Sequence, residues 1–274
     1  MTTPAPWVPP PDPVLDRPRG VEWIWFFARF IPLTSLIFGG LIILLILRAF
    51  ERPLCGRSRP ITPAITQFVC RNTLRIIGLR FKCQGTPMRH PGAMVANHSS
   101  WLDIFVLNAS ARVYFVSKSE VAGWPLIGWL ARATGTVFIR RKRADAKAQA
   151  QVFEDRLHAG HQLLFFPEGT STDGKDIIAF KSTLFQAFFN DNMKPVSYIQ
   201  PVTVKYKAAN NAAQTFYGWW GDMAFASHFV EILKTKRQGE VTVTYHMPIK
   251  VSDYESRKTL ALASENAVRA GFVV

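Results

Sequence analysis

A histidine and an aspartate that could carry acid–base chemistry, His98 and Asp103, follow the short apolar run Ala93–Ala96. Inside one continuous helix, residues five apart point about 140° away from each other, so these side chains could not share a face. They can meet if Ala93–Ala96 is a strand and a helix begins at Ser99 or Ser100. His98 would then lie in the turn, and Asp103 would reach back to hold one imidazole nitrogen. A neutral histidine held in this way presents its other nitrogen as a general base.

Asp103 also fits a purely structural role. Ser100 and Asp103 have the spacing of a capping box with an acid in the place of the usual glutamate. In such a box the acid accepts a hydrogen bond from the backbone at the helix start. Spacing alone favours the two roles of Asp103 equally, and both can coexist.

A second loop with polar side chains follows the expected strand Gln162–Phe166. It contains Glu168, Gly169 and Thr170. The glycine permits a close backbone approach, and the two side chains offer acceptors and a donor for a polyol or a phosphate. The alternative is an ordinary polar turn with a threonine as a helix cap, and this loop alone does not separate the two readings.

A third segment ends in two arginines, Arg140 and Arg141, directly after the apolar residues 137–139. Paired guanidinium groups at a strand end suit a phosphate or a carboxylate, although arginines there are usually only solvated. In open α/β sheets, ligands bind in the loops at the carboxyl ends of the strands. These three loops are therefore where we expect the chemistry.

The elements that must position these loops alternate along the chain. Aliphatic, aromatic or β-branched runs bounded by glycine, proline or asparagine predict strands at Ala93–Ala96, Arg112–Ser117, Thr136–Arg140, Gln162–Phe166, Val196–Lys205 and Val241–His246. The stretches between them predict helices at Leu102–Ala109, Glu120–Ala133, Asp145–Ala159, Ser182–Asn190 and Tyr254–Ala270. This alternation predicts an α/β fold, with a mixed, largely parallel sheet flanked by helices.

The chain before this domain is of a different kind. Seven prolines in the first 18 residues indicate an extended, mobile head, which we place at residues 1–20. We expect membrane-docking helices over residues 21–82 and the α/β domain over residues 83–274. The run Phe30–Leu47 has 18 uncharged residues, about 27 Å as a helix, which is close to the hydrocarbon thickness of a bilayer.

Membrane association of Phe30–Leu47 is favoured over burial in a core. Tryptophans precede the run and four arginines follow it between Arg48 and Arg59, as in an interfacial belt and a cytoplasmic flank. A full span and insertion into one leaflet both fit. The residues after Pro60 fit an amphipathic interfacial helix and, nearly as well, a surface helix packed on the core. The arginine asymmetry predicts a protein of the inner membrane with its catalytic domain in the cytoplasm.

The charge balance limits the classes of molecule that are expected to bind. Lysine and arginine number 33 against 19 acids, a formal charge of +14, which favours phosphate-bearing substrates, an acidic protein or an anionic membrane leaflet. The cations are dispersed and are not gathered with stacking aromatics, so nucleic acid is not expected as a partner. The three cysteines have no C-x-x-C spacing and the six histidines lack suitably spaced acidic partners, so we expect no metal and no cofactor.

The order of four motifs, NHSSWLD, GTVFIR, FPEGT and the proline-bearing IQPV, resembles the glycerolipid acyltransferase family. The best known members of that family are lysophosphatidic acid acyltransferases. The resemblance covers roughly Ala93 to Val204, and four ordered motifs make it specific. It implies that His98 deprotonates an acceptor hydroxyl while Asp103 orients the imidazole. The acyl donor would be a thioester of acyl carrier protein or coenzyme A, and no covalent acyl-enzyme is required.

The same resemblance implies roles for residues in the other loops. Arg140, Glu168, Gly169 and Thr170 match family positions that bind the head group of the acceptor. Pro201 matches the last motif and would shape the pocket.

One departure from the family pattern bears on the acceptor. Many members that use a phosphate acceptor read EGTR, and this chain has Ser171 in the place of that arginine. Losing a bidentate phosphate ligand disfavours a phosphomonoester more than a zwitterionic acceptor. The runs FPEGTSTDG, FKSTLF and YGWWGDM resemble the lyso-ornithine lipid branch, which esterifies the 3-hydroxyl of an N-acylated ornithine.

We therefore expect a membrane-associated O-acyltransferase that acts on lyso-ornithine lipid, with lysophosphatidic acid as the close alternative. A non-catalytic, lipid-binding membrane scaffold is the alternative from a different class. The intact His98, Asp103 and Glu168 argue against a scaffold.

Overall fold

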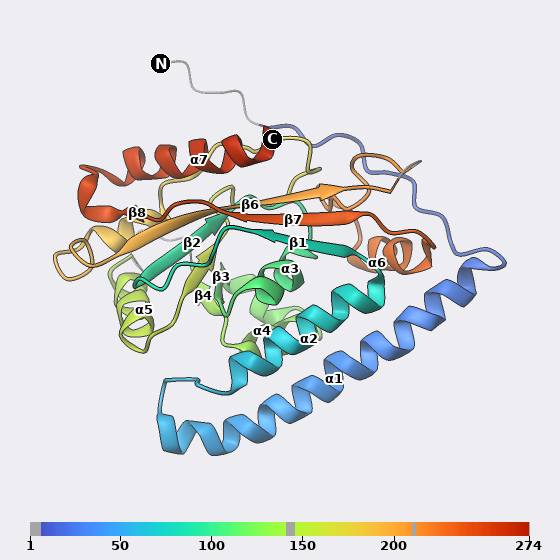
Figure 1. Ribbon diagram of the computed structural model, residues 1–274, viewed down its shortest axis with the longest axis horizontal. Coiled ribbons are helices and arrows are strands. Elements are labelled where there is room, and N and C mark those ends of the chain that lie inside the picture. The colour runs from blue at the N-terminus through green and yellow to red at the C-terminus, as the bar shows by residue number, and fades with distance from the viewer. Residues whose placement is uncertain (1–6, 141–145, 210–211, 274) are drawn as a thin grey trace.

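A computed structural model describes residues 7–140, 146–209 and 212–273. Across these residues, one eight-stranded sheet lies between two layers of helices (Figure 1). The strands are β1 (Arg80–Gln84), β2 (Gly92–Ala96), β3 (Tyr114–Lys118), β4 (Val137–Ile139), β5 (Leu163–Phe165), β6 (Tyr198–Lys207), β7 (Glu240–Tyr245) and β8 (Ile249–Lys250). The expected α/β fold is confirmed.

The sheet is mixed and largely parallel, as predicted. Its order is β1-β7-β6-β2-β5-β3-β4, with β8 beside β6. β6 runs antiparallel to β7 and β8, and the other neighbours pair in parallel. Because β2, β5, β3 and β4 run in one direction, the loops that follow them leave from the same edge of the sheet.

The α-helices are α1 (Glu22–Cys55), α2 (Thr62–Ile77), α3 (Asp103–Ser110), α4 (Ile127–Thr134), α5 (Ala146–His158), α6 (Phe225–Lys234) and α7 (Arg257–Val273). Side chains of α1, α2, α3 and α6 form a core on one face of the sheet, and those of α5 and α7 form a second core on the other. In β2, Met94 belongs to the first core while Ala93 and Val95 belong to the second. The period of two along this fully buried strand therefore serves both layers.

Two predicted helices differ from the structure. The expected helix Glu120–Ala133 is divided into a 3-10 helix, η1 (Ser119–Gly123), and α4. The cause is Pro125, which has no N–H and forces the preceding Trp124 out of the helical region, to φ −70° and ψ 131°. The expected helix Ser182–Asn190 is also of the 3-10 kind, as η3 (Leu184–Phe189).

The prediction missed two strands, β1 and β8, one α-helix, α6, and the short 3-10 helix η4 (Val251–Asp253). β1 is a mostly exposed edge strand, and its polar residues carry little strand signal. Because β1 pairs with β7, the sheet already begins at Arg80, inside the range expected for the docking helices. The other strands and helices predicted for the α/β domain are present, with ends shifted by up to three residues. Arg141 and the expected helix start at Asp145 lie outside the described residues.

Helix α1 lies along the domain, beside α2 (Figure 1). Near its start, Arg29 donates hydrogen bonds to the carbonyl oxygens of Leu233, Thr235 and Lys236 at the end of α6. Near its end, the buried Glu51 accepts from the backbone N–H groups that open α2. These anchors are about 33 Å apart at the rise of an α-helix, so both ends of α1 are fastened to the domain.

The outer face of α1 is apolar and uncovered. Among the described residues, α1 is the one helix long and apolar enough to cross a membrane, and only 11% of its most apolar window is buried. Its exposed large apolar side chains include Phe27, Ile31, Ile42, Ile46 and Phe50. A continuous apolar face of this kind marks a site of contact with a membrane or a partner.

The described part of the proline-rich head, residues 7–19, contains neither helix nor strand. It runs against the domain, where the indole N–H of Trp220 donates to the carbonyl of Pro10. The ammonium group of Lys234 donates to the carbonyl of Asp16 in the same way.

Candidate active site

Asn97 fixes the turn after β2 by hydrogen bonds to β6. Its side-chain amide donates to the carbonyl of Val204 at 2.8 Å, and its oxygen accepts from the backbone N–H of the same residue at 2.8 Å. A side chain that mimics a peptide group extends the pairing of β2 with β6 by one rung. The backbone of His98 can therefore leave the sheet while the backbone groups of Val204, within β6, stay paired.

His98 and Asp103 meet in this turn. The imidazole Nδ1 lies 2.8 Å from Asp103 Oδ2. α3 begins at Asp103, later than the expected start at Ser99 or Ser100, and Asp103 accordingly lies at the first helical position. Because a carboxylate only accepts hydrogen bonds, Nδ1 must carry the proton, and Nε2 is left with a free lone pair. Among the described residues, no hydrogen bond occupies Nε2.

Asp103 performs both roles that its spacing allows. Besides the imidazole, its Oδ2 accepts from the backbone N–H groups of Ser99 at 2.9 Å and Ser100 at 3.0 Å. Its Oδ1 accepts from the phenol of Tyr206 at 2.7 Å. Burial, followed by the neighbouring Asp103 charge, raises the pKa of Tyr206 well above its usual range, so the phenol remains a donor. The fully buried carboxylate therefore has four donors.

The imidazole of His98 lies between the loop that follows β2 and the loop that follows β5. Its ring stacks on Phe166 of the second loop, with centroids 4.0 Å apart and an interplanar angle of 12°. The carbonyl of His98 accepts from the backbone N–H of Thr172 at 3.0 Å. The side chain of His98 keeps 19% of its surface exposed, whereas that of Asp103 has none. The free Nε2 is thus placed on a rigid, partly accessible ring.

The polar residues of the second loop, which follows β5, differ in their exposure to solvent. Gly169 adopts φ +78°, a left-handed conformation that favours glycine, and Thr170 is exposed. Glu168 is fully buried, and among the described residues neither of its carboxyl oxygens has a hydrogen-bond partner. Burial raises the pKa of Glu168 well above its usual range, and the nearby backbone N–H of His98 offsets only part of this effect.

Arg140 stands apart from this cluster. It follows β4 at the edge of the sheet, with β3 between β4 and β5. Its side chain is exposed, and no contact joins it to the other loops among the described residues; its carbonyl accepts from Gln149. Pro201 is buried within β6, opposite Val95 of β2. The fold therefore brings His98, Asp103 and the Glu168 loop together and leaves Arg140 further along the same edge.

Sequence reasoning missed two residues of the site. Tyr206 and Asn97 hold Asp103 and the turn before it through β6, about a hundred residues away in the chain. No local pattern marks such contacts. For Asn97, its place directly after a strand and before the histidine was the available signal.

The arrangement can abstract a proton from a hydroxyl group brought to Nε2, and Asp103 would stabilise the imidazolium that forms. Among the described residues, no group of three or more histidine, cysteine, aspartate or glutamate side chains could hold a metal ion.

Comparisons with known proteins agree with this geometry. The family model described as "Acyltransferase" matches residues 80–205. A lyso-ornithine lipid O-acyltransferase of Rhodobacter capsulatus is 57% identical over 239 residues, which cover 87% of either chain. The protein of the same name from Pseudomonas aeruginosa is 34% identical and covers 77% of this chain and 79% of its own.

A solved structure has the same fold. The 1-acyl-sn-glycerophosphate acyltransferase of Thermotoga maritima superposes with a TM-score of 0.63 at 20% sequence identity, over 91% of this chain and 94% of that one. With a matching family model and relatives of 57% and 34% identity across most of both chains, the present chain belongs to the glycerolipid acyltransferase family and is similar to its lyso-ornithine lipid branch.

Proposed function

We propose that this acyltransferase moves a fatty acyl chain from a thioester of acyl carrier protein or coenzyme A to the hydroxyl of lyso-ornithine lipid. The observation that carries the proposal is the 2.8 Å bond between His98 Nδ1 and Asp103 Oδ2, which leaves Nε2 free on a partly exposed ring. A base in this state can act on an alcohol, and the thioester supplies the activated acyl group.

The reaction needs no covalent enzyme intermediate. Nε2 of His98 takes the proton of the acceptor hydroxyl while the oxygen attacks the thioester carbonyl. The tetrahedral intermediate collapses, the carbon–sulfur bond breaks, and the departing thiolate takes the proton back from the imidazolium. One ester forms and one thioester is consumed. General base catalysis contributes about 10²–10⁴-fold, and positioning and polarisation of the thioester supply the remainder.

Two observations support lyso-ornithine lipid as the acceptor. The relatives that cover most of this chain at 57% and 34% identity are named for that lipid, whereas the 1-acyl-sn-glycerol-3-phosphate acyltransferase of Neisseria meningitidis is 28% identical over 66% of this chain. Ser171 also replaces a potential phosphate ligand beside the exposed Thr170. Thr170 and the Gly169 backbone are the groups of this loop that an acceptor head group would meet first, because Glu168 is buried.

The membrane gives the enzyme access to its lipid acceptor. Because Arg29 and Glu51 fasten both ends of α1 to the domain, we infer that α1 lies within one leaflet and does not cross the bilayer. The arginines that follow its apolar run favour the cytoplasmic face of the inner membrane. An impermeant maleimide applied to intact cells should then fail to label a Val21→Cys variant.

The acceptor test uses the purified full chain in mixed micelles, with acyl carrier protein and coenzyme A thioesters compared as donors. Lyso-ornithine lipid and lysophosphatidic acid are offered at equal surface concentration, and thiol release and lipid product are both measured. We expect a higher kcat/KM for lyso-ornithine lipid. The matched control is His98→Ala, which should lose about 10²–10⁴-fold in kcat while keeping its thermal unfolding temperature.

The outcomes separate the alternatives. A higher kcat/KM for lysophosphatidic acid would make the phosphate lipid the acceptor and would contradict the inference from Ser171. Activity that survives in His98→Ala would remove the proposed base. Binding to lipid without acyl transfer to any acceptor would favour the scaffold.

A further inference from the structure

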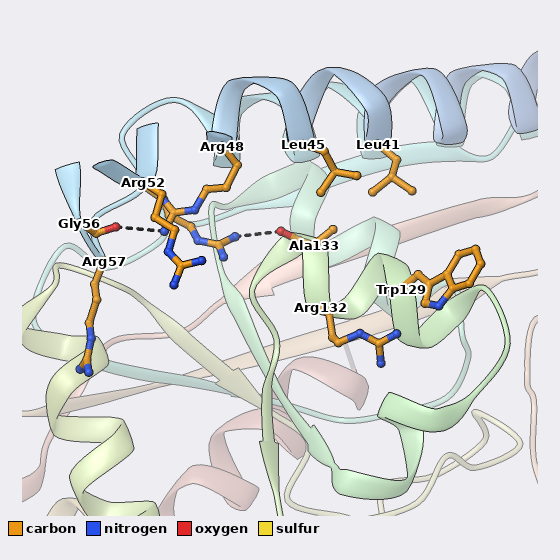
Figure 2. A pocket seen from close by; sticks show the side chains of 10 residues that line it. Leu41, Leu45, Arg48, Arg52, Gly56, Arg57, Trp129, Arg132 and Ala133 are labelled. Carbon is orange, nitrogen blue, oxygen red and sulfur yellow. Dashed lines mark hydrogen bonds between the residues drawn. The ribbon is translucent and has the colours of Figure 1, made fainter. Parts of the chain in front are cut away.

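A cavity of about 810 Å³ lies between the carboxyl-terminal half of α1 and helix α4 (Figure 2). Five arginines line it, and no acidic residue is among the described residues that do so. They are Arg48, Arg52, Arg57, Arg59 and Arg132. We call this cavity the arginine pocket. Its volume is in the range of sites that hold small molecules or lipid head groups.

The arginine pocket is not part of the active site. Arg59 donates to the carbonyl of Ala133 at 2.9 Å, and its guanidinium lies beside Gly135 and Tyr114. Gly135 precedes β4, and Tyr114 opens β3, so this contact lies at the amino ends of the parallel strands. His98 lies at their carboxyl ends. The two sites are therefore at opposite edges of the sheet.

Positive charge in the arginine pocket is only partly neutralised. Arg48 pairs with the buried Glu51 at 3.2 Å, and Arg57 pairs with Asp155. Arg52 is exposed and has no partner among the described residues. The remaining two arginines donate to backbone carbonyls, which carry no net charge. Three of the five guanidinium groups are thus left without a carboxylate.

The pKa of a buried histidine beside the arginine pocket reflects the positive electrostatic potential there. Burial, followed by the guanidinium groups of Arg156, Arg59 and Arg48, lowers the pKa of His161 to about 4. Its Nδ1 lies 3.1 Å from Arg156, a contact that a neutral imidazole can accept. The Nε of Arg59 is buried and has no partner among the described residues. An anion bound here would relieve repulsion that the protein leaves uncompensated.

The other wall of the arginine pocket is apolar and continues into the lipid-facing side of α1. Leu41 and Leu45 point from α1 toward α4, where Trp129 lines the same pocket (Figure 2). Trp129 is 61% exposed, and Trp124 and Leu126 just before it are exposed as well. Exposed tryptophans next to arginines are typical of the interface between head groups and acyl chains. A small soluble anion would make no apolar contact with this wall, whereas the acyl chains of a lipid would.

We propose that the arginine pocket binds the phosphate of an anionic phospholipid from the host membrane, with the acyl chains of that lipid lying against α1. Guanidinium groups match phosphate oxygens in pairs, and the apolar wall matches the start of the chains. The bound lipid is separate from the acceptor at His98, and it would fix the depth and tilt of the domain on the leaflet.

The test measures binding of the full chain to vesicles of neutral phosphatidylcholine, with and without one third phosphatidylglycerol. We expect several-fold stronger binding to the anionic vesicles. Arg52→Gln/Arg132→Gln should lose most of that increment and keep the binding to neutral vesicles. The matched control, Arg19→Gln/Arg75→Gln, removes the same charge from exposed positions outside the pocket, near the start of α1 and on α2, and should lose far less.

A second measurement tests the site itself. Native mass spectrometry of the detergent-solubilised protein should show one retained phosphatidylglycerol on the wild type and on the control variant. Arg52→Lys/Arg132→Lys keeps the charge and loses the planar fork, so this variant should still bind anionic vesicles but should not retain the lipid. Unchanged thermal unfolding of each variant verifies that it is folded.

Three results would overturn the proposal. Equal losses in the pocket and control variants would mean that diffuse surface charge attracts the membrane. Inorganic phosphate that stabilises the wild type but not Arg52→Gln/Arg132→Gln, without any lipid retention, would mean that the ligand is a soluble phosphate. Unchanged vesicle binding together with a raised KM for acyl carrier protein thioesters would make the pocket a docking site for that acidic protein.

Discussion

The two carboxyl groups nearest His98, those of Asp103 and Glu168, have opposite environments. Both are fully buried, and both follow parallel strands that neighbour each other in the sheet. Asp103 accepts from four donors, whereas Glu168 accepts from none among the described residues that meets hydrogen-bond geometry. One carboxyl group has the hydrogen-bond donors that stabilise an anion, and the other lacks them.

This difference assigns them different chemistry. Four donors compensate the desolvation of Asp103, so it can stay charged and stabilise the imidazolium of His98 during proton transfer. Burial raises the pKa of Glu168, and the charge of Asp103 raises it further, so the fold favours the neutral form of this acid over its anion. A pair of acids whose surroundings differ in this way can serve one site without repelling each other. Three substitutions would break or sharpen this contrast.

The largest effect is expected from Asp103→Asn. The amide oxygen of asparagine can still accept the hydrogen bonds that Asp103 Oδ2 accepts, with the NH2 group turned toward the Tyr206 hydroxyl, but the imidazole loses the anion that stabilises its charge. We expect kcat to fall by about 10²–10⁴-fold, as for the removal of general base catalysis. Steady-state kinetics with saturating lysolipid measure this loss.

Ser100→Ala is the control for that variant. It removes the hydroxyl that receives the backbone N–H of Leu102 at 3.3 Å and leaves the backbone N–H that Asp103 uses. Its activity should stay within about threefold of the wild type, as expected for an exchange that spares the catalytic geometry. An Asp103→Asn enzyme with the same kcat as Ser100→Ala would show that Asp103 only caps α3.

Tyr206→Phe should have an intermediate effect. It removes the donor to Asp103 Oδ1 and leaves a buried oxygen unsatisfied, which costs about 1–3 kcal/mol of unfolding free energy. With fewer donors the carboxylate attracts the imidazolium more strongly, so the acid limb of the pH profile of kcat/KM should move to higher pH. We expect kcat to fall by roughly tenfold with little change in KM, as expected for a group that positions the base.

Tyr217→Phe separates this effect from a loss of stability. Tyr217 stacks on Tyr206 with centroids 5.3 Å apart, but its hydroxyl bonds to Gln238 and to the backbone of Gly239. Its loss should lower the unfolding temperature without moving the pH profile. Equal pH profiles in the two variants would show that Tyr206 is only a packing residue.

The sequence predicted the site where the chemistry is local. His98 and Asp103 lie within one strand-to-helix turn, and the geometry of that turn required only the end of β2 and the start of α3. The same reasoning could not choose between a cap and an imidazole partner, because both use the same carboxylate. Tyr206 was out of reach, since β6 approaches the turn only through the order of the sheet.

Elsewhere, tertiary contacts overrode local signals. The apolar run predicted a helix over Phe30–Leu47, and α1 extends beyond it at both ends because Arg29 and Glu51 find buried partners in α6 and α2. β1 is a strand because β7 pairs with it, not because its residues favour one. The break at Pro125 was the opposite case, in which the local signal was present in the sequence and the long helical pattern hid it.

The smallest and most specific effect is expected from Glu168→Gln, which tests whether this acid is neutral in the folded protein. Because the folded pKa lies above the ordinary value, the folded protein binds more protons than the unfolded chain as pH rises past about 5, and stability falls over that range. Because glutamine does not titrate, the Glu168→Gln variant should not lose stability in this way as pH rises. The unfolding temperature of Glu168→Gln should therefore match the wild type near pH 5 and exceed it by a few degrees near pH 8, at about 2–4 °C for each kcal/mol. Glu255→Gln, at an exposed position, should show no such divergence. A Glu168→Gln protein that is less stable than the wild type at pH 8 would mean that Glu168 is ionised and has a partner, and the contrast with Asp103 would then be lost.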